Sequence, residues 1–336
     1  MTRRPPTMAD IARETGVSPM TVSRAFKQDG AVSAERRAEI LGVAERLGYV
    51  FDSTASNFRS QRTDFVAVTI PSINNANFAD TVRGLTEGLS ARGLQILLGY
   101  TDYDIHEEER LIEQLLQRRP EAIVVTGGRH TDRARRMLAN AGIPVVETWD
   151  LPPDPLGHVV GFSNAEAARG MVDHFVTAGY RRIAFIGGDA DRDTRGTDRR
   201  AGFIAAMESH GLDATRLIAA GLPPISMREG ADAMGLLLDR FPDTEAVICV
   251  ADLSAFGALT ECQRRGVDVP GRIAIAGFGD FELAAISVPS LTTINAFARE
   301  IGAQAAEVIL EVLDGRQVGP AIRLIRPDLI IRQSSL

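Results

Sequence analysis

The chain has 336 residues, of which 45% are hydrophobic and 24% charged, with a formal net charge of −7. These values are typical of a globular protein and exclude a disordered or collagen-like chain. No stretch reaches the roughly 18 apolar residues of a membrane span, and no apolar signal-peptide core is present near residue 1. We therefore expect a cytoplasmic protein with no membrane partner. Cys249 and Cys262 are too few for a disulfide framework or a zinc site and are interpreted as buried thiols.

The charge is distributed unevenly along the chain. Residues 1–62 contain ten Arg or Lys against seven Asp or Glu, a net charge of +3, whereas the remainder carries −10. A basic head on an acidic body is consistent with a nucleic-acid reader joined to a regulatory domain. The excess is small, so the argument for DNA depends on the pattern of the head itself.

The first 50 residues have the pattern of three short helices. Apolar residues recur at helical spacing on both sides of Gly16 and again between Ile40 and Leu47. Ser18 followed by Pro19 is a typical helix start. The order helix, tight turn, helix predicts a helix-turn-helix DNA-binding domain, and a three-helix bundle that contacts protein is the alternative.

The rest of the chain divides into a linker and a large core. Residues 52–63 contain one large apolar residue, Phe58, and predict a linker with little helix stability of its own. From Asp64 short apolar strands alternate with amphipathic helices, which predicts parallel α/β sheets. We expect strands at residues 65–70, 94–100, 122–127, 143–147, 158–162, 183–188, 246–250, 273–278 and 322–331. We expect helices at residues 77–92, 106–118, 199–210, 253–265 and 297–313, and a further helix that begins at residue 164.

These strands are too many for one sheet, and a proline-rich break at residues 151–158 separates two similar halves. We therefore predict an α/β protein whose core has two doubly wound lobes with a cleft between them. The predicted boundaries are 1–50 for the head, 51–63 for a hinge and 64–336 for the core, with lobe one at about 64–162 and 294–321 and lobe two at about 163–293 and 322–336.

Motifs along the whole chain resemble the lactose/galactose-repressor family. They include MADIARETGVSPMTVSRAF and AVSAERRAEILGVAERLGY in the head, and VPGRIAIAGF and PSLTTI in the core. PSINNANFADTVRGL and VGFSNAEAARGM are similar to the repressors of gluconate-utilisation operons within that family. The resemblance implies a helix-turn-helix head, a hinge helix, a periplasmic-binding-protein-like core, and a homodimer whose affinity for double-stranded operator DNA changes on effector binding. No leucine heptads follow the core, so we expect a dimer rather than a tetramer.

The same resemblance assigns DNA contacts. Pro19, Met20 and Arg24 stand at base-reading positions, and Arg24 suits a guanine edge. Phe58, beside Asn57, stands where the family usually inserts a leucine into the minor groove, so the degree of operator bending stays open; packing of Phe58 on the core is the alternative. Residues expected to touch or support phosphate are Thr7, Ser18, Thr21, Ser23, Ser33 and Tyr49.

Effector contacts are expected in loops at the carboxyl ends of strands. Arg199 matches the family's main ligand-binding arginine, and Arg195 lies one helical turn before it, so both could hold a carboxylate; a solvated helix face is the alternative. Gly279 stands where relatives that bind neutral sugars usually have an aspartate, which favours an acidic effector. Further expected effector residues are Ser72, Asn77, Phe78, Glu147, Asp252 and Asp280, and Trp149 is expected near the cleft.

Other kinds of site are not supported by the sequence. Asp189, Asp191 and Asp193 imitate the start of a calcium loop, but Thr194 and Arg200 occupy positions that need Gly and Glu. Nucleotide-binding glycine motifs, GxSxG and paired histidines are lacking, so we expect no metal, no cofactor and no catalytic residue.

Two hypotheses of function follow. The first is a repressor of sugar-acid catabolic genes that leaves its operator when gluconate, 6-phosphogluconate or a related sugar acid binds. The second is a two-lobed sugar-acid enzyme or solute-binding protein. The operator sequence, the effector and the sign of the response stay open.

Overall fold

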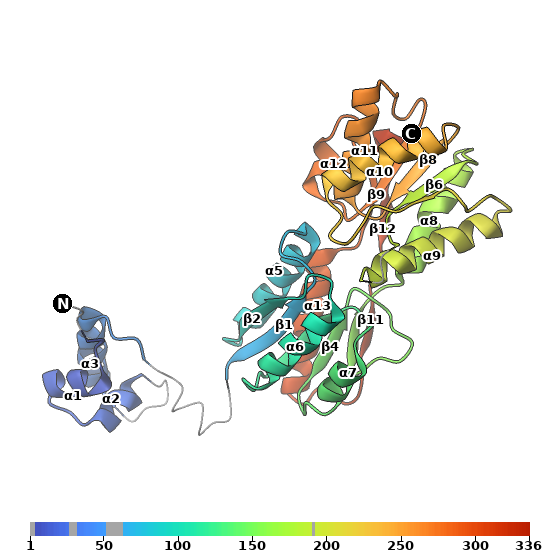
Figure 1. Cartoon of the computed structure of the whole chain (residues 1–336). Helices are drawn as coiled ribbons and strands as arrows, with labels where there is room; N and C mark the ends of the chain where they lie inside the picture. Colours follow the sequence, from blue (N-terminus) through green and yellow to red (C-terminus); the bar gives the residue numbers. More distant parts are fainter. Residues whose placement is uncertain (1–3, 27–31, 52–62, 190–191) are drawn as a thin grey trace. The chain divides into compact units, whose positions relative to one another are not determined.

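The computed structural model describes residues 4–26, 32–51, 63–189 and 192–336 (Figure 1). It divides into a head, Met1–Arg62, and a core, Thr63–Leu336. Asn57 and Phe58, the expected hinge contacts, lie outside the described residues. In the described part of the chain, no helix has both the length and the apolar character that crossing a membrane requires.

The head contains the predicted three helices, α1 (Met8–Thr15), α2 (Pro19–Ala25) and α3 (Ala34–Leu47). Gly16 ends α1 in the left-handed conformation, at φ 65°, which costs glycine little and lets the chain turn at once into α2. The Ser18 hydroxyl accepts a hydrogen bond from the Thr21 amide and so caps α2. Ile11, Val22 and Ile40 are fully buried at the centre of the bundle, one from each helix.

The described part of the core contains two six-stranded sheets, one in each lobe. The first sheet has the order β11-β5-β4-β3-β1-β2, with β1 (Phe65–Ile70), β2 (Gln95–Tyr100), β3 (Ala122–Thr126), β4 (Val145–Thr148), β5 (His158–Gly161) and β11 (Ile322–Leu324). The second has the order β12-β10-β9-β8-β6-β7, with β6 (Ile183–Ile186), β7 (Leu217–Ile218), β8 (Ala246–Cys249), β9 (Ala274–Phe278), β10 (Thr292–Asn295) and β12 (Asp328–Ile330). All pairings are parallel except β10 with β12. The expected doubly wound two-lobed core is confirmed.

Helices pack in close pairs around the sheets, as α5 and α13 do in the first lobe of Figure 1. A side chain at Gly302 of α13 would meet the Thr81 carbonyl of α5 at 2.0 Å, so the two backbones touch directly. The first lobe holds α5 (Ala76–Ser90), α6 (Ile105–Leu116), α7 (Asp132–Ala139) and α13 (Ala298–Leu313). The second holds α8 (Asn164–Thr177), α9 (Thr194–Ser209), α10 (Met227–Arg240), α11 (Asp252–Arg265), α12 (Glu282–Ile286) and a short 3-10 helix (Gln333–Ser335). Cys249 and Cys262 are buried free thiols, as expected.

The chain crosses between the lobes after β5, after β10 and after β11, and two predicted boundaries need correction. Residues 294–295 belong to the second lobe because β10 pairs with β9, and residues 322–324 belong to the first because β11 pairs with β5. The terminal apolar run 322–331, expected as one strand, is therefore split between two sheets. The sequence did not predict α7, α10, α12, β7 or β10. Helix α9 begins at Thr194 rather than near residue 199, because Asp193 caps it.

Candidate effector site and nucleic-acid interface

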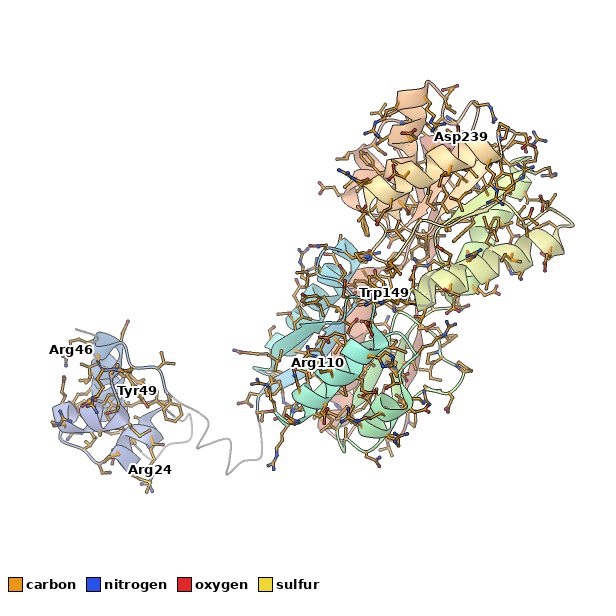
Figure 2. The ribbon with its side chains drawn as sticks, viewed as in Figure 1. Arg24, Arg46, Tyr49, Arg110, Trp149 and Asp239 are labelled. Atoms are coloured by element: carbon orange, nitrogen blue, oxygen red, sulfur yellow. The ribbon has the colours of Figure 1, made fainter. Side chains whose placement is uncertain are left out.

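A cavity of about 200 Å³ lies between the two lobes of the core. Figure 2 shows Trp149 at the junction of the lobes, and its indole is buried and lines the cavity. The first lobe contributes Asn74, Asn75, Asn77, Phe78, Tyr103 and Trp149, which follow β1, β2 and β4. The second contributes Asp193, Arg195 and Arg199 after β6, residues 223–226 after β7, Val250, Ala251 and Leu253 after β8, and Phe278 and Phe281 at the end of β9. The cavity therefore lies at the carboxyl ends of strands from both sheets.

The Arg199 guanidinium is held from several sides. Its Nε donates to Oδ1 of Asn164 at 2.9 Å, and its Nη1 donates to the Val250 carbonyl at 2.9 Å. Its Cζ lies 3.4 Å from the centroid of the Phe278 ring, a cation–π contact. Burial lowers the pKa of Arg199 to about 10, so the group is still a cation at neutral pH.

The Arg195 guanidinium lies one turn earlier on α9 and reaches into the first lobe. Its Nη1 donates to the Thr126 carbonyl at 3.4 Å, and its Cζ lies 5.6 Å from the Phe78 ring and 5.9 Å from the Tyr103 ring. Arg195 is 6% exposed and Arg199 is 9% exposed. Two buried guanidinium groups therefore line the cavity, and each contacts aromatic rings.

Within the described residues, neither arginine has a carboxylate within ion-pair distance. Asp193 also lines the cavity, but its Oδ1 accepts from the Gly196 amide at 3.0 Å, so it caps α9. A buried cation is costly unless it is paired, and two cations against one capping carboxylate leave an excess of positive charge. The arrangement is suited to an anionic ligand.

Four of the eight expected effector residues line this cavity, namely Asn77, Phe78, Arg195 and Arg199. Ser72 and Glu147 do not. The Ser72 hydroxyl accepts from the Asn74 amide at 3.1 Å and shapes the loop after β1. Glu147 is fully buried in β4, where it accepts from the Leu156 amide at 2.7 Å and lies 3.5 Å from Nε2 of His130.

Asp252 and Asp280 also have structural partners instead of facing the cavity. Asp252 is fully buried and accepts from the Phe281 amide at 2.8 Å and the Thr293 hydroxyl at 2.6 Å. Burial raises its pKa to about 6. Asp280 forms an ion pair with Arg332 at 2.7 Å, which ties the loop after β9 to the end of the chain. The structure does not place either expected carboxylate in the cavity lining, because each has a distant partner that residue type and sequence position do not reveal.

Gly279 has a definite role at the cavity wall. It adopts φ +136°, and a side chain there would lie 2.9 Å from the Asn77 amide nitrogen and 2.7 Å from the Phe281 ring. Both neighbours line the cavity. Glycine at this position therefore keeps a side chain, including the aspartate expected in sugar-binding relatives, out of the site.

Several residues that line the cavity were not predicted from the sequence. Asn74 and Asn75 follow β1, and Tyr103 follows β2, so the rule that ligands meet the carboxyl ends of strands could have found them. Residues 223–226 gave no such signal, because they follow the two-residue strand β7. Asp193 was considered only for calcium; among the described residues no cluster of His, Cys, Asp or Glu could hold a metal ion, and Asp191 lies outside them.

The head presents one face of α2 to solvent. Val22 and Ala25 point into the bundle, whereas Met20 is 59% exposed. Arg24 is also exposed, and its side chain makes no hydrogen bond or ion pair with any described residue. Figure 2 shows Arg24 at the edge of the head. This is the geometry that a recognition helix needs to reach base edges in a major groove.

The other expected DNA contacts surround that face or support it. Ser18, Pro19 and Ser33 are exposed, and Thr21 and Ser23 are half-buried. The Thr7 hydroxyl donates to the Asp10 carboxylate at 2.7 Å, which makes it a support for α1. Tyr49 packs its ring edge-on against Phe26, 5.8 Å between centroids.

A helix-turn-helix head joined to a two-lobed core with a ligand-sized cavity defines the class of ligand-responsive regulators that bind DNA. Two family models match the chain: "Bacterial regulatory proteins, lacI family" over residues 7–52, and "Periplasmic binding protein-like domain" over residues 172–335.

Curated relatives cover nearly the whole chain. The HTH-type transcriptional regulator GntR of Pseudomonas aeruginosa is 35% identical over 98% of this chain and 96% of its own length. The regulator of the same name from Escherichia coli K12 is 32% identical over 95% and 96%. A LacI-family transcriptional regulator from Silicibacter pomeroyi has a solved structure with a TM-score of 0.91 at 34% identity, covering 98% of this chain and 99% of that one. The chain belongs to the LacI family of bacterial regulatory proteins and is a DNA-binding transcriptional regulator rather than an enzyme.

Proposed function

We propose that this regulator represses genes of sugar-acid catabolism and leaves its operator when a small sugar acid of the gluconate type fills the cavity between the lobes. The observation that carries the proposal is the pair Arg195 and Arg199: two buried guanidinium groups face one cavity with no carboxylate partner in the described chain. A guanidinium matches the planar geometry of a carboxylate and can donate two parallel hydrogen bonds to it.

The other cavity groups are consistent with a polyhydroxylated acid. Asn74, Asn77 and Ser226 offer amide and hydroxyl groups to a carbon chain rich in hydroxyls. Gly279 leaves the wall without a carboxylate, and Asp280 is neutralised by Arg332 outside the cavity lining. These features favour an anion over a neutral hexose, because no acidic side chain at that wall would repel it.

In this proposal the active form is a homodimer on a palindromic operator, as the family resemblance implies. Ligand binding closes the lobes and thereby lowers the affinity of the paired heads for the operator. Sedimentation at micromolar concentration should give a dimer, and a dominant tetramer would contradict this part of the proposal.

The test combines effector and operator binding. The preferred DNA sequence is first selected from a random library, and its affinity is then measured by fluorescence anisotropy with and without each compound. Calorimetric titration with gluconate, 6-phosphogluconate and glucose identifies the effector class. The proposal predicts that a sugar acid binds and lowers operator affinity; tighter binding of glucose than of gluconate would reassign the effector to neutral sugars.

A further inference from the structure

Asn164 contacts the Arg199 guanidinium from outside the cavity lining. It is the first residue of α8, immediately after the chain has crossed from the first lobe to the second. Ser163, not Asn164, caps α8, because the Ser163 hydroxyl accepts from the Glu166 amide at 3.2 Å. Asn164 is buried, with 2% of its surface exposed, so its amide finds its hydrogen-bond partners within the protein.

Both ends of the Asn164 amide are used. Its Oδ1 accepts from Nε of Arg199 at 2.9 Å, and its Nδ2 donates to the backbone carbonyl of Trp149 at 3.0 Å. The guanidinium nitrogen is only a donor and the carbonyl is only an acceptor, so a single orientation of the amide satisfies both. Aspartate would lack the donor for Trp149, and alanine would lack both groups.

The contact also links the lobes. Trp149 directly follows β4 of the first sheet, whereas Asn164 and Arg199 lie on α8 and α9 of the second lobe. With Nε bound by Asn164 and Nη1 by Val250, the guanidinium is fixed by two hydrogen bonds before any ligand arrives. Within the described chain no hydrogen bond uses Nη2, so this nitrogen is left for a ligand. A group fixed in its binding orientation loses less conformational entropy on binding.

We propose that Asn164 is a positioning residue that holds Arg199 in the orientation needed for its anionic ligand and joins that guanidinium to the first lobe through the Trp149 carbonyl. The effect on binding of the anionic ligand rests on the proposed function, whereas the role of Asn164 in holding the Arg199 guanidinium does not.

The experiment uses two variants of the full chain. Asn164→Ala removes both hydrogen bonds. Asn164→Asp keeps the size and the acceptor for Arg199 but replaces the donor to Trp149 with a second acceptor. Asn140→Asp is the matched control, because Asn140 is an exposed asparagine whose Nδ2 also donates to a backbone carbonyl, that of Arg136, at 2.8 Å.

The first readout needs no ligand. NMR measures hydrogen exchange of the Arg199 Nε–H, identified as the resonance that Arg199→Lys lacks. We expect exchange about tenfold faster in Asn164→Ala and nearly unchanged in Asn164→Asp and Asn140→Asp, because only alanine removes the acceptor. Unchanged exchange in Asn164→Ala overturns the proposal.

The second readout is the Kd for gluconate by calorimetry. We expect a loss of about tenfold in Asn164→Ala and a larger loss in Asn164→Asp, whose charge competes with the anion for Arg199, with no change in Asn140→Asp. If Asn164→Ala does not fold, an affinity of Asn164→Asp within twofold of the unchanged chain overturns the proposal. If the unchanged chain takes up no gluconate while Nε–H exchange responds as expected, the effector assignment fails and the positioning role stands.

Discussion

Arg129 of the first lobe and Asp198 of the second form an ion pair across the cleft of the core. Asp198 lies on α9 beside Arg199, and Arg192, just before that helix, pairs with Asp104 of the first lobe at 2.9 Å. The same segment thus carries the two arginines that line the cavity and two ionic contacts to the opposite lobe. In the proposed function, this segment couples lobe closure to ligand contact.

The Arg129–Asp198 pair is partly exposed, so its contribution should be small and sensitive to salt. A double-mutant cycle with Arg129→Ala and Asp198→Ala should give a coupling free energy of about 0.5–1 kcal/mol in urea unfolding, decreasing in 0.5 M salt. The Arg265–Asp239 pair, which lies within the second lobe, provides the control cycle. A coupling of zero at low salt would mean that the lobes do not hold this pair together in solution.

Arg199→Ala should weaken gluconate binding roughly a hundredfold, because a buried charged hydrogen-bond donor is removed. Operator affinity of the ligand-free protein should stay nearly intact, since Arg199 is in the core and not in the head. Fluorescence of Trp149, the single tryptophan of the chain, reports the titration directly. Arg200→Ala is the control, as Arg200 is the next residue on α9 but does not line the cavity; normal induction of Arg199→Ala would refute the carboxylate model.

Arg24→Ala should remove preference at one base pair of each operator half-site at a cost of about 1–3 kcal/mol. The measurement is selection from a random DNA library with both proteins, followed by anisotropy on single-base operator variants. Arg36→Ala serves as control, because Arg36 lies on α3 and pairs with Glu39 at 2.7 Å. If Arg24→Ala retains full discrimination while overall affinity falls, Arg24 contacts phosphate and the recognition helix has been placed wrongly.

His130 should make the stability of the core depend on pH. Burial alone would lower the pKa of His130, but its hydrogen bond with Glu108 at 2.7 Å and the charges of Glu108 and of the nearby Glu147 carboxylate raise it to about 9. Because the folded pKa lies above the unfolded value of about 6.5, this stabilisation is complete below pH 6.5 and is lost as the pH rises through about 9. The full difference corresponds to at most about 3 kcal/mol.

Urea unfolding at pH 6, 7.5 and 9 tests this expectation. The unfolding free energy of the unchanged chain should fall relative to that of His130→Gln over this range. His106→Gln, which alters an exposed histidine at the start of α6, should follow the unchanged chain. Parallel pH profiles for His130→Gln and the unchanged chain would show that the histidine is not charged in the folded core.

Local sequence was sufficient for the three helices of the head and for most strands and helices of the core, but not for α7, α10, α12, β7 and β10. Ser18, Pro19 and Gly16 mark helix ends by hydrogen bonding and backbone geometry within a few residues, so the helix-turn-helix could be predicted. The alternation of apolar strands with helices likewise predicted the two lobes. Arg195 and Arg199 were found because motif and helical spacing place both on the first turns of one helix after a strand.

Only the tertiary structure decided which polar side chains reach the cavity. Glu147 and Asp252 lie at strand ends as a binding residue would, yet they are fully buried against His130 and Thr293, and the latter is 41 residues from Asp252 in sequence. The terminal run 322–331 was split in the same way, by pairing with β5 and β10. Hydrogen bonding and strand pairing between distant segments fix these positions, and a side chain used to satisfy such a partner is no longer available to a ligand.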